Sequence, residues 1–100
     1  MSYKVIPAKK VAELLAAEDV VVLDMRDSKA FLEGHIQGAI QATEDHVVKV
    51  VEETADDTPV LVYCYYGVSS RKLAEYLANQ GLNNVYSLEG GWGAWCLQQS

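Results

Sequence analysis

The sequence predicts an α/β domain in which helices cover both faces of a mostly parallel sheet. Short apolar runs rich in β-branched residues alternate with segments whose apolar residues recur at helical spacing, the order expected of strand–helix–strand units. Two of these runs, Val20–Leu23 and Val60–Tyr63, are continuously apolar, as in strands that are buried on both faces. One hundred residues are enough for one small hydrophobic core, so we expect a single domain spanning 1–100.

The first predicted strand, Tyr3–Ile6, precedes a helix whose apolar residues recur at helical spacing between 11 and 15. Pro7 suits the first turn of that helix, because proline lacks only an N–H that the first turn leaves unpaired. The second predicted strand, Val20–Leu23, is a continuous apolar run that ends at Asp24. A strand, a helix and a second strand therefore open the chain.

A short helix is expected next, because Asp27 or Ser28 can cap its first turn and Gly34 lies past its end. Gly38–Gln41 is a short predicted strand. Thr43 is an N-cap candidate for a third helix, which has valines at helical spacing and two acidic residues near its positive end. An acidic, solvated turn follows this helix.

The second half of the chain repeats the pattern twice. A strand runs over Pro59–Tyr63, since proline is tolerated at the first residue of a strand. A helix with an apolar face between 73 and 78 follows, and Gly81 lies past its end. Val85–Leu88 is the last predicted strand, and a closing helix follows Gly90–Gly91.

Composition excludes several classes of function. A formal net charge of −6 argues against binding to nucleic acid or to an anionic membrane surface, since both would repel an acidic chain. The N-terminal segment lacks the features of a signal peptide and no apolar run approaches the length of a membrane span, so we expect a cytoplasmic protein. Cys64 and Cys96 make no disulfide framework, and no cysteine–histidine cluster has zinc spacing, so we expect no metal and no cofactor.

The candidate catalytic residue is Cys64, which stands between a predicted buried strand and a predicted helix. A thiol at the carboxyl end of a parallel strand lies where open α/β sheets bind ligands. The free N–H groups and the dipole of the following helix favour the thiolate, and Arg71 adds a positive charge nearby. The alternative is an inert cysteine that only packs.

Three stretches together span almost the whole chain: Val22–Asp27 with Phe31 and Gly34–Ile40, the six-residue loop Cys64–Ser69, and Leu88–Trp92 with Ala94 and Trp95. In their order and spacing they resemble the signatures of the rhodanese family of sulfurtransferases. Within the family, the loop and its lead-in over 57–60 are most similar to single-domain bacterial thiosulfate sulfurtransferases encoded with glycerol 3-phosphate metabolism genes. The resemblance implies the rhodanese-like three-layer fold, a sheet of about five strands between helices, in agreement with the alternation above.

The resemblance also implies a two-step exchange at Cys64. Its thiolate would take the outer sulfur of thiosulfate and pass it, from a persulfide, to cyanide or to a thiol acceptor such as a thioredoxin-like dithiol protein. Backbone N–H groups of the loop suit such an anionic donor. The expected substrate-binding residues are Tyr65, Tyr66, Gly67, Val68, Ser69, Ser70 and Arg71. Ser69 and Ser70 have an alternative role as helix caps. Between Cys64 and Ser70 there is no basic side chain, so we expect weak donor binding.

The other polar residues of the signatures have structural explanations. We expect Asp24 and Arg26 to brace the loop as a hydrogen-bonded ion pair, since buried charges need partners. His35 is expected to bond to backbone, because a thiolate with a low pKa needs no general base. Trp92 is expected to pack. Cys96 lies on the closing helix, where nothing indicates the geometry of a disulfide with Cys64.

Three other functions compete with thiosulfate sulfurtransferase. The nearest is a sulfur carrier that receives its sulfur from another protein. A Cys-dependent phosphatase would need arginine at the sixth position after the cysteine, which is Ser70, whereas Arg71 comes one residue later. A non-catalytic interaction module with the same fold would usually have lost the cysteine that this chain retains.

Overall fold

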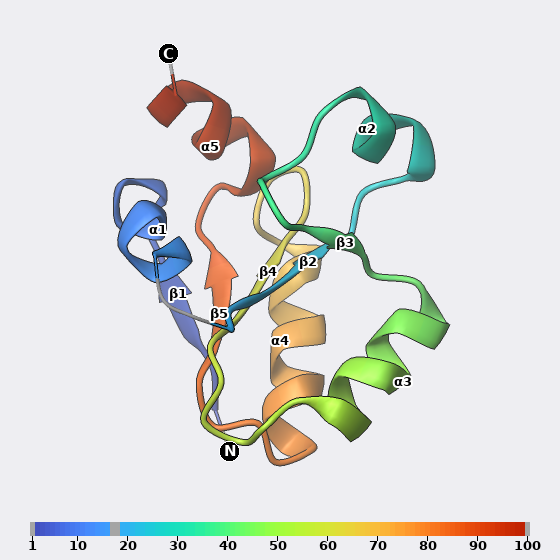
Figure 1. Cartoon of the computed structure of the whole chain (residues 1–100). Coiled ribbons are helices and arrows are strands. Elements are labelled where there is room, and N and C mark those ends of the chain that lie inside the picture. The colour runs from blue at the N-terminus through green and yellow to red at the C-terminus, as the bar shows by residue number, and fades with distance from the viewer. Residues whose placement is uncertain (1, 17–18, 100) are drawn as a thin grey trace.

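In the computed structural model, which describes residues 2–16 and 19–99, five strands form one sheet in which every pair of neighbours is parallel. The strands are β1 Lys4–Ile6, β2 Val21–Asp24, β3 Ile40–Gln41, β4 Val60–Tyr63 and β5 Val85–Leu88. Their order across the sheet is β1-β5-β4-β2-β3 (Figure 1). The predicted α/β fold with a parallel sheet is confirmed, and β4 is its central strand.

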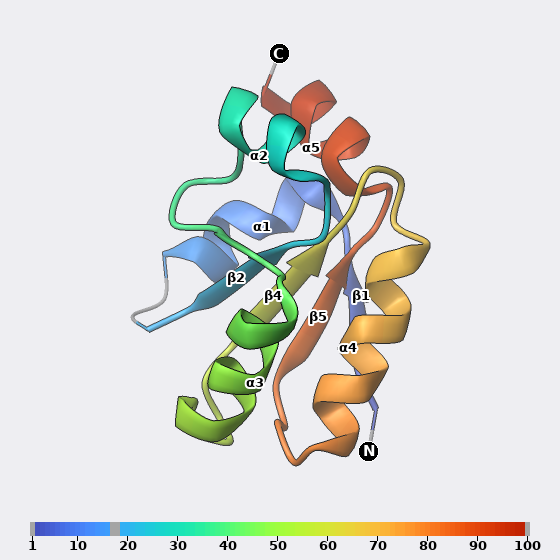
Figure 2. The same ribbon diagram turned by 90° about the vertical axis from the view of Figure 1, so that its right-hand side faces the viewer.

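Helices cover both faces of the sheet, as Figure 2 shows. They are α1 Ala8–Leu15, α2 Ser28–Glu33, α3 Glu44–Glu53, α4 Ser69–Asn79 and α5 Gly91–Gln99. Two of the predicted caps are present: an Asp27 carboxylate oxygen accepts the Ala30 N–H at 2.9 Å, and the Thr43 hydroxyl accepts the His46 N–H at 3.2 Å. The local sequence signals therefore place these helix starts correctly.

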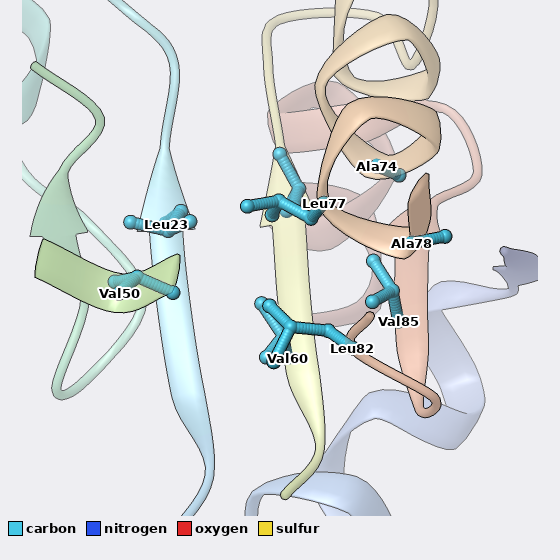
Figure 3. Close-up of a cluster of buried hydrophobic side chains, with 9 residues drawn as sticks. Leu23, Val50, Val60, Ala74, Leu77, Ala78, Leu82 and Val85 are labelled. Atoms are coloured by element: carbon cyan, nitrogen blue, oxygen red, sulfur yellow. The ribbon is translucent and has the colours of Figure 1, made fainter. Parts of the chain in front are cut away.

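The core consists of two apolar layers, one on each face of the sheet. On one face Leu23, Val60 and Val85 pack against Val50 of α3 and Leu77 of α4 (Figure 3). On the other face the alternate strand residues pack against α1 and the α2–β3 connection; they include Val22, Leu61, Tyr63 and Leu88. Because successive strand residues point to opposite faces and both faces are covered, the central strand β4 has an unbroken apolar sequence that is buried throughout.

The carboxyl ends of β2, β4 and β5 lie at one edge of the sheet, because the three strands are parallel neighbours. Asp24 ends β2, Cys64 follows β4, and Gly90 comes two residues after β5 ends. The loop between β4 and α4 lies at the same end of the sheet as α2 and α5 (Figures 1 and 2). Among the described residues, no helix combines the length and the apolar character needed to cross a bilayer.

Candidate active site

Cys64 is buried in the loop that joins β4 to α4, with 6% of its surface exposed. Its Sγ accepts two backbone N–H groups, from Gly67 at 3.2 Å and from Ser70 at 3.4 Å. Gly67 has a φ of +86°, and a Cβ at this position would come within 2.7 Å of the Gly90 backbone nitrogen. A residue without a side chain is therefore required for the loop to curve around the sulfur.

Two opposing effects set the acidity of this thiol. Burial is the strongest influence and by itself raises the pKa of Cys64, because a charged sulfur loses contact with water. The Ser70 hydroxyl is the strongest of the opposing hydrogen bonds, followed by backbone bonds from Ser70, Gly67 and Tyr66. The hydrogen bonds prevail, so the pKa of the Cys64 thiol lies below its ordinary value. A lowered pKa increases the fraction of reactive thiolate near neutral pH.

Ser70 lies beneath the sulfur, in the interior. It is completely buried, and its Oγ lies 3.4 Å from Cys64 Sγ and 2.8 Å from Ser87 Oγ. The residue at the N-cap of α4 is Val68, which makes no side-chain capping bond. Ser70 therefore belongs to the sulfur's surroundings, and the alternative that it caps the helix does not describe its contacts.

A small open cavity of about 240 Å³ gives access to the sulfur. Met25, Cys64, Tyr65, Tyr66, Val68 and Ser69 line it. Tyr66 and Val68 are largely exposed, at 79% and 67%, so the rim of the cavity is apolar and carries no formal charge. Arg71 is exposed on α4 and is not among the described residues that line the cavity. The structure thus gathers the predicted loop residues around Cys64 and leaves Arg71 outside their cavity.

Asp24 and Arg26 form a buried ion pair, with 2.7 Å between Asp24 Oδ2 and Arg26 Nη2. The Tyr63 hydroxyl donates to the same carboxylate at 2.6 Å, and Arg26 also donates to the Gly34 carbonyl. Burial and the bond to Asp24 raise the pKa of Tyr63 well above its ordinary value. Within the described chain, the side-chain bonds of this pair lead to Tyr63 and Gly34 rather than to the 64–69 loop backbone. These bonds therefore fix Tyr63, the residue immediately before Cys64, and not the loop itself.

Tyr65 connects the exposed side of the loop to α2 by a side-chain hydrogen bond. Its hydroxyl donates to Asp27 Oδ2 at 2.6 Å, and Asp27 is the residue that caps α2. The bond from Tyr65, followed by the Ala30 N–H, lowers the pKa of the Asp27 carboxyl. An exposed bond of this kind links the cysteine loop to α2 across 38 positions of sequence.

Backbone N–H groups at the start of α5 form hydrogen bonds with the loop backbone. The Trp92 N–H donates to the Cys64 carbonyl at 2.8 Å, and the Gly93 N–H donates to the Tyr65 carbonyl at 3.1 Å. Gly91 has a φ of +58°, and a Cβ there would collide with the Cys64 carbonyl. The glycine pair that the sequence presents as a strand–helix connection therefore also allows α5 to approach the loop closely.

The remaining candidate residues have structural contacts or lie away from the sulfur's cavity. His35 Nδ1 lies 2.8 Å from the Phe31 carbonyl, and its ring stacks on Phe31 with centroids 4.1 Å apart. Trp92 packs beneath the Arg26 guanidinium, whose carbon lies 4.0 Å from the ring centroid. Cys96 is exposed on α5. In the described part of the chain, no three potential metal ligands of the histidine, cysteine and carboxylate types come together.

Sequence reasoning missed Ser87, Tyr63 and the Tyr65–Asp27 bond. Ser87 is a buried polar residue among the apolar residues of β5. A serine in a predicted buried strand is the signal that could have identified it. Tyr63 and Tyr65 flank Cys64, but their partners are 39 and 38 positions away in sequence. Nothing local in the sequence indicates those partners.

Comparisons with known proteins identify the family of the chain. The family model described as Rhodanese-like domain matches residues 7–98. Thiosulfate sulfurtransferase GlpE from a Pseudomonas putida strain is 42% identical over 93% of this chain and 84% of its own length. GlpE from Shewanella oneidensis is 36% identical over 94% of this chain and 93% of its own length.

A solved structure from Rhodopseudomonas palustris, described as a protein of unknown function and possible tyrosine phosphatase, has a TM-score of 0.80 and 25% identity. The match covers 98% of this chain and 83% of the chain in that structure. The family match spans nearly all of the chain and includes Cys64 and the signatures on either side of it. The resemblance predicted from the sequence is thus confirmed, and the chain belongs to the rhodanese-like domain family.

Proposed function

We propose that this chain is a thiosulfate sulfurtransferase in which Cys64 carries the transferred sulfur. The observation that carries the proposal is a buried thiol at the end of the central strand, with a lowered pKa and with N–H groups of Gly67 and Ser70 directed at its sulfur. Such a sulfur is a nucleophile that needs no adjacent general base. The name shared by the bacterial relatives supports thiosulfate as the donor.

The reaction has two displacements at sulfur. The Cys64 thiolate attacks the outer sulfur of thiosulfate, the bond between the two donor sulfurs breaks, and sulfite leaves with the electron pair. A thiolate acceptor or cyanide then attacks the terminal sulfur of the persulfide, and Cys64 leaves as the thiolate. The N–H groups of Gly67 and Ser70 stabilise the negative sulfur at the beginning and end of this cycle.

The residues around the sulfur have separate tasks in this proposal. We assign donor binding to the loop and the start of α4, namely Tyr65, Tyr66, Gly67, Val68, Ser69, Ser70 and Arg71. Arg71 acts from outside the cavity, by attraction at a distance. Asp24 and Arg26 brace the end of β4 through Tyr63. No residue of this set is assigned a metal or a cofactor.

The position of arginine argues against a phosphatase. A Cys-x5-Arg phosphatase loop would need arginine where Ser70 stands, and Ser70 is completely buried with its hydroxyl bonded to Ser87. Arg71 lies one residue further along α4, about 100° around the helix axis. An exposed arginine in that direction cannot replace the bidentate grip on phosphate that such enzymes require.

The acceptor belongs to the same proposal. We infer a small thiophile such as cyanide, or a thiol of a thioredoxin-like dithiol protein, because the neutral rim of the cavity neither attracts nor repels a particular charge. We place this reaction in the cytoplasm as part of the same proposal. A sulfur carrier loaded by another protein is the nearest alternative. It differs only in the donor, because its Cys64 would also carry a persulfide. A non-catalytic module would leave the reactive geometry at Cys64 without a use.

Mass spectrometry tests the proposal. After incubation with thiosulfate, the Cys64 peptide should gain one sulfur atom, and a reducing thiol should remove it. The Cys96 peptide from the same sample is the internal control and should remain unchanged. A Cys64 peptide that takes up no sulfur at any thiosulfate concentration would contradict the proposal, while sulfur uptake only from a protein persulfide would select the carrier.

Replacing Val68 with arginine should improve the use of thiosulfate. Val68 lines the cavity and is 67% exposed, so its replacement places a cation at a rim that carries none. The wild-type protein, with its net charge of −6, should need roughly millimolar thiosulfate. We expect kcat/KM to rise about twofold to fivefold at low ionic strength and less at high salt, since salt screens exposed charges.

Val48→Arg is the matched control for this prediction. It adds the same charge to an exposed valine on α3, which lies at the opposite end of the sheet from the cysteine loop (Figures 1 and 2). The measurement is kcat/KM for thiosulfate at two salt concentrations in wild type and both variants. An equal gain in the two variants would mean that net charge alone governs donor approach, and no gain in Val68→Arg would show that residue 68 does not face the donor.

A further inference from the structure

Ser87 is a buried hydroxyl on β5 that the exchange reaction described above does not use. It is 1% exposed, and its Oγ lies 2.8 Å from Ser70 Oγ. Ser70 is itself completely buried, and its Oγ lies 3.4 Å from Cys64 Sγ. A buried hydroxyl is costly unless it is hydrogen-bonded. The three side chains therefore form a continuous polar row that runs from the sulfur into the core.

The single proton on each hydroxyl limits how this row can be arranged. While Cys64 is a thiol, its S–H can donate to Ser70 Oγ, which in turn can donate to Ser87. A thiolate can only accept. Once the sulfur is charged, Ser70 must therefore donate its hydrogen bond to the sulfur, and its oxygen becomes free to accept a hydrogen bond from Ser87. The two hydroxyls rotate and neither one ionises.

We propose that Ser87 is a positioning residue that acts through Ser70: its hydroxyl donates to Ser70 Oγ and so holds the Ser70 proton on the Cys64 sulfur. A hydroxyl that accepts one hydrogen bond is a stronger donor in the next one, so Ser87 strengthens the bond that stabilises the thiolate. The Ser70 hydroxyl is already the strongest of the bonds that favour the charged sulfur. Ser87 does not touch the donor or the acceptor.

Other charged and titratable groups near the cysteine remain the same in the variants described below. Those on the loop and next to it in sequence or by contact include Tyr65, Tyr66, Arg71, the Asp24–Arg26 pair with Tyr63, Asp27 and Glu89. In the described structure, the side-chain hydrogen bonds of these groups do not involve Ser70 or Ser87. A change in thiol reactivity on removal of the Ser87 hydroxyl is therefore assigned to the serine row.

The test is the rate of Cys64 alkylation by iodoacetamide across pH, followed on the Cys64 peptide so that Cys96 does not contribute. Below the thiol pKa the rate follows the thiolate fraction, which changes about tenfold per pKa unit. We expect Ser87→Ala to lower the rate in this range about threefold and Ser70→Ala about tenfold. At high pH, where the thiol is ionised regardless of its bonds, the serine variants should react at least as fast as the wild type, because a thiolate with a higher pKa is the stronger nucleophile.

The double variant Ser70→Ala/Ser87→Ala separates positioning from a general effect on folding. If Ser87 acts through Ser70, the double variant should react like Ser70→Ala alone. Tyr86→Phe is the matched control, because it removes a hydroxyl from the same strand at a residue that packs on the opposite face of the sheet. Its alkylation profile should equal that of the wild type, and urea unfolding should show every variant folded under assay conditions.

Two outcomes would overturn the role of Ser87: an unchanged alkylation profile in Ser87→Ala, or a double variant whose shift is the sum of the two single shifts. The inference rests on the proposed function, since Cys64 must be the reacting thiol for the row to matter. The two can fail separately. Absence of sulfur uptake from thiosulfate would reject the proposed function while the alkylation result stands, and normal uptake with an unchanged Ser87→Ala profile would reject only this inference.

Discussion

Replacing Cys64 with serine should abolish the transfer of sulfur from thiosulfate to cyanide. A serine hydroxyl does not ionise at neutral pH, and its oxygen cannot carry a sulfane sulfur as a persulfide does. The N–H groups of Gly67 and Ser70 remain in place but have no reactive sulfur to stabilise. We expect a loss of at least about a thousandfold, of the order seen when a catalytic nucleophile is removed.

The measurement is thiocyanate formation from thiosulfate and cyanide, with Cys96→Ser as the control. Cys96 is exposed on α5, so its replacement should leave turnover close to that of the wild type. Urea unfolding should show that Cys64→Ser is folded, because serine is slightly smaller than cysteine and can accept the same N–H groups. Transfer that persists in pure Cys64→Ser would disprove the proposed role of this residue, whereas a severe loss in Cys96→Ser would indicate a second essential thiol.

The fold was predictable from the sequence because its signals are local. Caps such as Thr43 and apolar runs such as Val60–Tyr63 report on the few residues around them. The parallel arrangement also follows from the alternation of strands and helices. The position of Cys64 at the end of a strand could be predicted for the same reason. The loop residues around Cys64 could also be predicted, because they are its neighbours in the sequence.

The partners behind the loop could not be predicted, because they depend on which strands become neighbours. Ser70 meets Ser87 only because β5 lies beside β4 under α4. Tyr63 reaches Asp24 because β2 lies on the other side of β4 and pairs residue 24 with residue 63. Sequence patterns indicate that Asp24 needs a partner. They do not indicate which hydroxyl will provide it.

Replacing Asp24 with asparagine should destabilise the fold strongly. The Asp24 carboxylate is completely buried and accepts bonds from the Arg26 N–H, the Arg26 guanidinium and the Tyr63 hydroxyl. Asparagine keeps the shape but removes the charge, and its amide group presents protons to donors that need an acceptor. The Arg26 guanidinium would then be buried without its counter-ion. We expect a loss of about 3–5 kcal/mol in the free energy of unfolding, measured with urea.

Asp27→Asn is the matched control, because Asp27 also accepts a tyrosine hydroxyl at 2.6 Å but lies at the surface. Water and salt screen that exposed bond, and asparagine is an equally good N-cap, so the urea midpoint should hardly change. Burial is thus the variable that separates the two aspartates. If Asp24→Asn were as stable as Asp27→Asn, the Arg26 charge would have to find another acceptor in the folded protein, and the ion pair would not be what holds the end of β2 against Tyr63.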